Sequence, residues 1–228
     1  NALPVVDLYN RLKGVVTWDD IQDVVEEETT EEIYASSGIS TGDIDEDEIL
    51  AGSLFTSVRA RTPWLFVTLV GEFIAVNVAN HFDGTLKAFP IIAIFMPLLA
   101  GLAGNIGTQS ITLMVRGLST GQITVSSAMY NIFRESVIGL LIGTIFGIMV
   151  TLCTWGWQHN VELGCVVGVS MAINMALATL IGTFTPFAMK KMNIAPAVAS
   201  GPVIATAIDV LGLAVYFSLA TFYVVKFM

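Results

Sequence analysis

The chain has 228 residues, of which 54% are hydrophobic and 13% are charged, and its mean hydropathy is +0.75. This composition excludes an ordinary soluble protein and is typical of a membrane protein. Residues 1–48 carry 14 acidic and two basic side chains, whereas residues 49–228 carry five acidic and eight basic side chains. An acidic segment is unsuited to nucleic acid and attracts cations. The sequence therefore predicts an acidic water-soluble segment followed by a membrane domain.

The first 36 residues predict two short strands and a helix. The runs LPVVD (3–7) and GVVTW (14–18) are rich in β-branched residues and are joined by a turn. Thr17 followed by Asp20 resembles a capping box, so we expect a helix to run on through residues 21–36. Because the chain opens at Asn1 within an expected strand, we expect it to be the later part of a longer polypeptide.

Five apolar stretches follow, and each is long enough to cross a bilayer, which takes roughly 20 residues. They are residues 63–82, 88–115, 136–155, 162–188 and 194–225. We interpret Arg134 and Glu135, just before the third stretch, as anchors at the inner membrane interface. The fold class predicted is an all-α membrane protein with five transmembrane helices.

The basic residues of the short connections predict the orientation of the spans. Six of them fall on the side of the N-terminal segment, and Lys87 and Lys226 fall on the other side. The six are Arg59, Arg61, Arg116, Arg134, Lys190 and Lys191. Since positive charge collects in the cytoplasm, we expect a plasma or inner membrane protein with a cytoplasmic N-terminus and an external C-terminus.

Small residues recur every four positions in the third and fourth spans. Gly139, Gly143 and Gly147 share one helix face, as do Gly164 and Gly168. Stripes of this kind let helix backbones approach closely, so we expect them to serve packing within the helix bundle.

Asp209 is the only charged residue between Lys191 and Lys226. An aspartate near the middle of a membrane span costs about 2.5–3.5 kcal/mol on insertion scales. The position predicts a bound cation, a proton, a basic partner or a water-filled path. The alternative is a protonated or hydrogen-bonded aspartate that only ties helices together.

A second polar motif, PLLAGLAGNIGTQSITLMVRG (97–117), lies in the second span. Its glycines reduce bulk, while Asn105, Thr108, Gln109 and Ser110 bring polar groups into the membrane. Polar groups at this depth are tolerated only inside protein or beside a wet cavity. Their oxygens suit a hard cation, although a cluster of hydrogen bonds between helices would have a similar sequence.

The two motifs carry a resemblance to a known family. The run GNIGTQSITLMVRG (104–117) resembles the second-span signature of the MgtE family of magnesium channels. The run PAVASGPVIATAIDVLGLAVYFSLA (196–220) resembles the same family, with Asp209 at its pore-aspartate position. The similarity covers nearly the whole chain, in the right order and spacing.

The resemblance implies a homodimer with a pore on its two-fold axis, lined by the second and fifth spans. Paired Asp209 side chains would hold a largely hydrated Mg²⁺, the Ala205 carbonyl would face the ion, and Asn105 would lie near the pore. Further lining is expected from Gly104 and Gly201, and we expect Asn174, in the fourth span, to hydrogen-bond another helix and to touch the pore. The chain departs from the family pattern at two positions: Gly201 stands where some members have Asn, and Ala195 stands where an acid is common.

The N-terminal part resembles the last strand pair and helix of a CBS domain, followed in this family by a connecting or plug helix. The implied domains are a CBS remnant (1–25), an acidic connecting region (26–58) and a pore domain (59–228). In the family, cytosolic Mg²⁺ bridges acidic side chains and closes the pore. The matching regulatory residues are Asp20, Asp23, Glu28, Glu31 and Glu32. The alternative is that these acids form only a solvated helix face.

The expected function is that of an Mg²⁺-selective channel inhibited by cytosolic Mg²⁺, not of an enzyme. An intramembrane aspartyl protease would need two opposed aspartates, and only Asp209 lies deep in a span. The alternative is a proton-coupled transporter of Mg²⁺, Mn²⁺ or Co²⁺, with Asp209 or Glu72 carrying protons. For Glu72, in the first span, we favour a protonated or hydrogen-bonded structural acid over a pore or coupling acid.

Overall fold

The computed structural model describes residues 2–40, 46–193 and 201–227. Its N-terminal part is a hairpin of β1 (Ala2–Val6) and β2 (Leu12–Thr17) followed by α1 (Trp18–Ser36). The strands pair antiparallel, with an irregularity between Val5 and Val6. The two expected strands and the helix after them are thus confirmed. Helix α1 runs without a break across the expected domain boundary at residues 25 and 26.

A reciprocal cap begins α1. The Thr17 hydroxyl accepts a hydrogen bond from the Asp20 backbone N–H, while Asp20 Oδ2 accepts from the Thr17 N–H at 2.7 Å and from its hydroxyl at 2.8 Å. The backbone hydrogen bond from Thr17, helped by the hydroxyl, lowers the pKa of the Asp20 carboxyl below its usual value. The capping box expected from the sequence is therefore present.

Five of the described helices are long and apolar enough to cross a membrane. These are α3 (Leu54–His81), α5 (Met96–Ser119), α6 (Ala128–Gln158), α7 (Val161–Lys191) and α8 (Gly201–Phe227). Short helical segments connect them: α2 (Glu46–Ala51), α4 (Asp83–Ala88), η1 (Pro90–Phe95) and η2 (Val125–Ser127). The predicted fold class, an all-α membrane domain after a small strand pair, is confirmed.

Helix α6 begins two turns earlier than the apolar stretch that predicts it. Arg134 is exposed, as an interfacial anchor would be, but Glu135 lies inside the helix and is only 5% exposed. Glu135 is tolerated there because the Ser110 hydroxyl of α5 donates to it at 3.3 Å and the Arg134 guanidinium lies 3.4 Å away. The interpretation of Glu135 as a membrane-surface anchor is therefore wrong.

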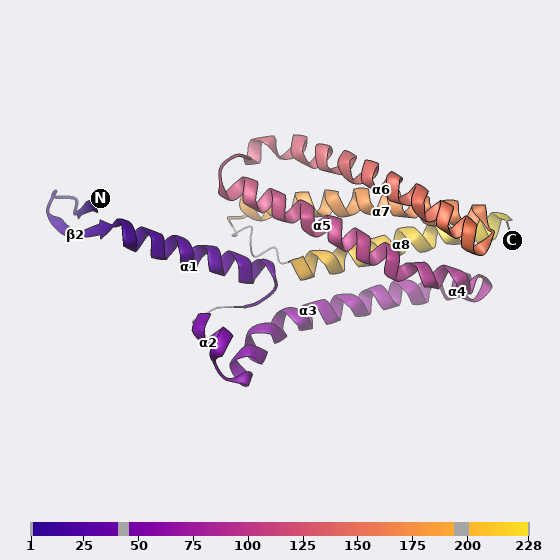
Figure 1. The fold of residues 1–228 in the computed structure, drawn as a ribbon, viewed down its shortest axis with the longest axis horizontal. Helices are drawn as coiled ribbons and strands as arrows, with labels where there is room; N and C mark the ends of the chain where they lie inside the picture. Colours follow the sequence, from indigo (N-terminus) through magenta and orange to yellow (C-terminus); the bar gives the residue numbers. More distant parts are fainter. Residues whose placement is uncertain (1, 41–45, 194–200, 228) are drawn as a thin grey trace.

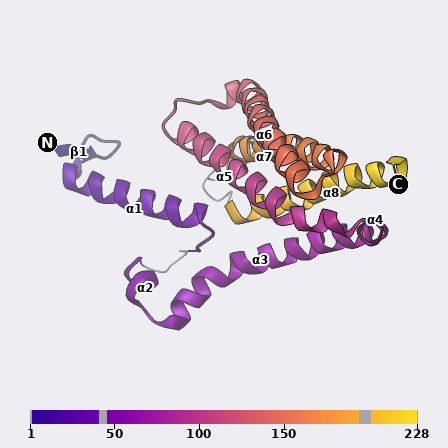
Figure 2. The ribbon, with the colours of Figure 1, turned by 45° about the vertical axis from the view of Figure 1, so that its right-hand side comes forward.

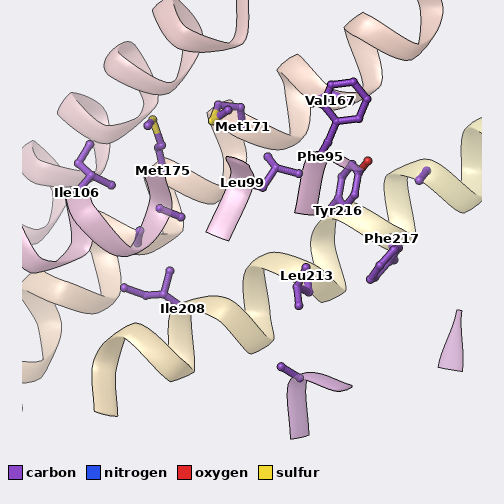
Figure 3. Packing of buried hydrophobic residues seen from close by; sticks show 14 of the residues in the cluster. Phe95, Leu99, Ile106, Val167, Met171, Met175, Ile208, Leu213, Tyr216 and Phe217 are labelled. Atoms are coloured by element: carbon purple, nitrogen blue, oxygen red, sulfur yellow. The ribbon is translucent and has the colours of Figure 1, made fainter. Parts of the chain in front are cut away.

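Helices α5, α6, α7 and α8 form a bundle, and α3 runs along one side of it (Figure 1; Figure 2). The N-terminal hairpin and α1 project from one end, and the C-terminus lies at the other. Half of the apolar stretch of α7 is buried, compared with 6% of that of α3, which packs mainly on α8. The core lies where α5, α7 and α8 meet, around Leu99, Met171, Met175, Ile208 and Tyr216 (Figure 3).

The closest helix pair is α6 and α7. A Cβ added at Gly147 would lie 2.4 Å from the Gly168 carbonyl oxygen, and one at Gly143 would lie 2.7 Å from the Ala172 Cα. The two glycine stripes therefore face each other and bring the backbones into direct contact, a pairing more specific than the bundle packing expected from the sequence.

The end of α1 touches the beginning of α8. Gly38 has a φ of +75°, and a Cβ there would lie 2.8 Å from the Pro202 ring and 3.4 Å from the Trp64 side chain of α3. The Ser40 N–H donates to the Ala60 carbonyl at 2.9 Å. The acidic helix is thus joined to the start of the helix that carries Asp209.

Candidate functional site

One face of α5 carries polar side chains that no other part of the described chain covers. Asn105, Thr108, Gln109 and Thr112 are all exposed, although they lie within a membrane span. A Cβ added at Gly104 would meet nothing within 4 Å. We call Asn105, Thr108, Gln109 and Thr112 the α5 polar face. The Thr108 and Thr112 hydroxyls donate to the Gly104 and Thr108 carbonyls of their own helix, each at 2.9 Å, so the Asn105 and Gln109 amides are the groups of this face that are costly against lipid.

Asp209 lies within α8, one turn after Ala205, and both residues are partly buried. Its Oδ1 is fully buried and has no hydrogen-bond partner among the described residues. The carboxylate lines a narrow gap between α5, α7 and α8. An ionised carboxylate left in this condition has lost its hydration without gaining a donor, which is unfavourable unless a ligand or another group completes the site.

Asn174 of α7 lines the same gap and is only 2% exposed. Its Oδ1 is also buried without a hydrogen-bond partner in the described part of the chain. The expectation that Asn174 bonds another helix is therefore not met by a direct contact. The structure instead places the unpartnered oxygens of Asn174 and Asp209, from α7 and α8, beside the same narrow gap.

The α5 polar face and Asp209 are not joined within one chain. On the α5 side, the gap at Asp209 is lined by Leu99, Ala100 and Ala103, whereas Asn105 is exposed. Across the described ranges, no group of three or more His, Cys, Asp or Glu residues could hold a metal ion. Of the residues expected near the pore mouth, Gly201 begins α8 and Ala195 lies outside the described residues.

Glu72 of α3 lies closer to the site than the sequence indicated. A Cβ at its neighbour Gly71 would clash with the Thr206 side chain of α8, so α3 rests on α8 at this level. Glu72 is exposed and has no hydrogen bond to any described residue, and Thr206 lies three residues before Asp209 on α8. No local pattern in the sequence reveals this proximity, because it arises from the packing of the first span on the fifth.

The acidic residues of α1 are exposed, and Asp20 differs from the others. Its carboxylate is occupied by the cap with Thr17, whereas the carboxylates of Asp23, Glu28, Glu31 and Glu32 lie along the helix and accept no hydrogen bond from a described residue. No residue of α1 is buried. A metal ion between these acids and another surface would therefore use groups from outside this helix.

A cavity of about 450 Å³ lies beside the ends of α5 and α6 and was not expected from the sequence. Its polar lining includes Gln109, Ser110, Arg116, Arg134 and Glu135. The signal that could have revealed it is the Glu135 carboxylate two turns inside a membrane helix. Its hydrogen bond from Ser110 ties α6 to the side of α5 opposite Asn105.

Comparisons with known proteins agree with this arrangement. Residues 96–219 match the family model MgtE, described as a divalent cation transporter. The chain is 36% identical over 223 residues to the magnesium transporter MgtE of Bacillus subtilis, which covers 98% of this chain and 48% of that protein. It is 34% identical over 219 residues to the magnesium transporter MgtE of Thermus thermophilus, and the aligned region covers 96% of this chain and 48% of that protein.

The chain thus spans about half the length of the curated relatives that it matches. The family model covers the polar motif of α5, both glycine stripes and Asp209. With five membrane-spanning helices and this match over more than half of its residues, the chain belongs to the MgtE family of divalent cation transporters.

Proposed function

We propose that two copies of this chain form the pore of an Mg²⁺-selective channel. The observation that carries the proposal is Asp209, a carboxylate within a membrane span whose buried oxygen has no hydrogen-bond partner among the described residues. The uncovered α5 polar face supports a path bounded by a second copy, since one chain leaves it open. The names of the relatives, magnesium transporters, support Mg²⁺ as the ion.

The chemistry of Mg²⁺ fits a sparse site of this kind. Mg²⁺ dehydrates reluctantly and keeps several waters, so a few oxygen groups are enough to hold the hydrated ion. In the proposed dimer, two Asp209 carboxylates supply the charge and the Ala205 carbonyls accept hydrogen bonds from the water shell. Asn105 and the space beside Gly104 and Gly201 line the path on either side.

We further propose that the acidic helix α1 is cytoplasmic and regulates the pore. Mg²⁺ bound to Asp23, Glu28, Glu31 and Glu32 would relieve their mutual repulsion and favour one position of α1. A ligand shifts such an equilibrium only by its different affinity for the two states. The contact between Gly38 and Pro202 offers a direct mechanical route from α1 to the helix that carries Asp209.

A proton-coupled divalent cation transporter is the second candidate. Glu72 favours it, because two carboxylates on adjacent helices within electrostatic reach can exchange protons for a divalent cation. Flux measurements in liposomes distinguish the two candidate functions. Mg²⁺ flux through a channel follows the electrochemical gradient of Mg²⁺ alone. Coupled transport would also be driven by an imposed proton gradient with no Mg²⁺ gradient.

Mg²⁺ uptake into liposomes by the full-length protein, with Asp209→Asn as the comparison, tests the proposal. The substitution keeps the size and polarity of the side chain and removes only its charge. Uptake that persists at the wild-type rate would remove Asp209 from the mechanism.

A further inference from the structure

Helices α5, α7 and α8 converge on the narrow gap beside Asp209. Its polar lining consists of Asn174 from α7 and Asp209 from α8, and its other walls include Ala100, Ala103 and Gly212. Apolar side chains surround this point, with Leu99, Met175 and Ile208 among those visible in Figure 3. The gap has no room for a water molecule, so no water can bridge the two polar side chains within it.

The two side chains have complementary needs. Asp209 Oδ1 is buried without a donor, whereas its Oδ2 is not among the buried unpartnered atoms. A carboxylate can only accept hydrogen bonds, and an asparagine amide offers two N–H donors. The Asn174 oxygen, Oδ1, is buried without a hydrogen-bond partner. Rotating the side-chain amide by 180° exchanges Oδ1 and Nδ2, and thus places an N–H donor where Oδ1 lies.

Gly212 sets the position of the Asn174 amide. A Cβ at residue 212 would lie 3.4 Å from Asn174 Nδ2 and 3.6 Å from its Oδ1, so the amide rests flat on α8 at the turn after Asp209. Within the described part of the chain, no cationic side chain lines the gap. Asn174 is therefore the available donor for the buried carboxylate oxygen.

We propose that Asn174 is a positioning residue for the pore carboxylate. Its amide donates a hydrogen bond to Asp209 Oδ1 and thereby turns Oδ2 toward the ion path. This inference rests on the proposed function, and it assigns to α7, which lies behind the second and fifth spans expected to line the pore, control over how the ion is held. Because each carboxylate is fixed from behind, the two copies present their Oδ2 atoms at a defined separation to the hydrated ion.

The role predicts a change in ion recognition rather than in the amount of assembled protein. Asn174→Leu has a similar volume but leaves Oδ1 buried with no donor. Asn174→Asp keeps the shape of the side chain and replaces the donor by an acceptor. In both variants we expect the Mg²⁺ concentration for half-maximal flux to rise about tenfold or more, since hydrogen bonds to buried charges are worth roughly that factor. The preference for Mg²⁺ over Ca²⁺ should fall with it.

Thr183 supplies a matched control on the same helix. Its hydroxyl is also fully buried and unpartnered, but it does not line the gap beside Asp209. Thr183→Val removes that hydroxyl with almost no change of shape. The full-length variants are compared in liposomes for maximal flux, half-saturating Mg²⁺ and the Mg²⁺/Ca²⁺ ratio, and by gel filtration for assembly.

The expected result is altered half-saturation and selectivity in Asn174→Leu and Asn174→Asp, with Thr183→Val like the wild type. Wild-type recognition in either Asn174 variant, while Asp209→Asn is inactive, would overturn the positioning role and leave the proposed function intact. An equal loss of assembled protein in the Asn174 and Thr183 variants would reduce Asn174 to a packing residue. Wild-type flux in Asp209→Asn would overturn the proposed function and this inference together.

Discussion

At the scale of single residues, the feature that most needs explanation is a set of polar side chains within a membrane span that stay exposed among residues 2–40, 46–193 and 201–227. Asn105 is the member of the α5 polar face expected to lie nearest the pore. Its exposure in one chain is what a pore between two chains requires, and lipid contact at the same place would leave its amide unsatisfied.

Asn105→Cys tests this face directly. After the exposed native thiols Cys153 and Cys165 are replaced by serine, a membrane-impermeant thiol reagent should modify the new cysteine and block Mg²⁺ uptake. Leu141→Cys, on the exposed apolar surface of α6, is the control and should remain functional after treatment. An unreactive Asn105→Cys, or uptake that survives its modification, would show that the path runs elsewhere.

At the scale of helices, the sequence predicts close packing of α6 and α7 within the bundle, although not that they pair with each other. Gly139, Gly143 and Gly147 are four residues apart, and a stripe of that kind allows close approach of a neighbouring helix. The sequence does not reveal that α3 packs on α8, because the apolar side chains of α3 are spread around the helix and it carries no such stripe. Glu72 lies on the helix next to that of Asp209 because α3 packs on α8.

Gly147→Val is expected to destabilise the bundle strongly. The added Cβ would lie 2.4 Å from a backbone oxygen of Gly168, which cannot move aside as a flexible side chain would. Overpacking typically costs about 1–3 kcal/mol, and a backbone clash belongs at the upper end of that range. Thermal unfolding in detergent measures the loss, and Gly156→Val, where a Cβ meets nothing within 4 Å, should unfold like the wild type. Equal midpoints for both variants would contradict the direct backbone contact.

At the scale of the whole molecule, the acidic helix and the membrane bundle meet through few contacts. Sequence patterns predict each part separately, since hydropathy reveals the spans and β-branched runs with a capping box reveal the hairpin and α1. They do not reveal that Gly38 touches Pro202, or that Asn174 and Asp209 share a gap, because these contacts join residues more than 30 positions apart. The coupling of α1 to α8 is therefore a property of the fold.

Neutralising Asp23, Glu28, Glu31 and Glu32 together should abolish inhibition by cytosolic Mg²⁺ without changing ion preference. Asp20 is left intact, because its carboxylate caps α1. Its lowered pKa means that the cap is fully present at neutral pH and is lost only as the pH falls through that value, so the cap does not confuse the experiment. Mg²⁺ flux of the full-length protein is measured against internal Mg²⁺ concentration. Inhibition at wild-type concentrations would show that these acids are only a solvated face.

The central claim, that Asp209 binds the ion in the pore, is tested most directly by Mg²⁺ uptake into liposomes containing full-length Asp209→Asn. Asp83→Asn, which neutralises the aspartate at the start of α4 beside Lys87, is the matched control. The account predicts that Asp209→Asn assembles normally and takes up almost no Mg²⁺, while Asp83→Asn matches the wild type. Uptake by Asp209→Asn at the wild-type rate would contradict it.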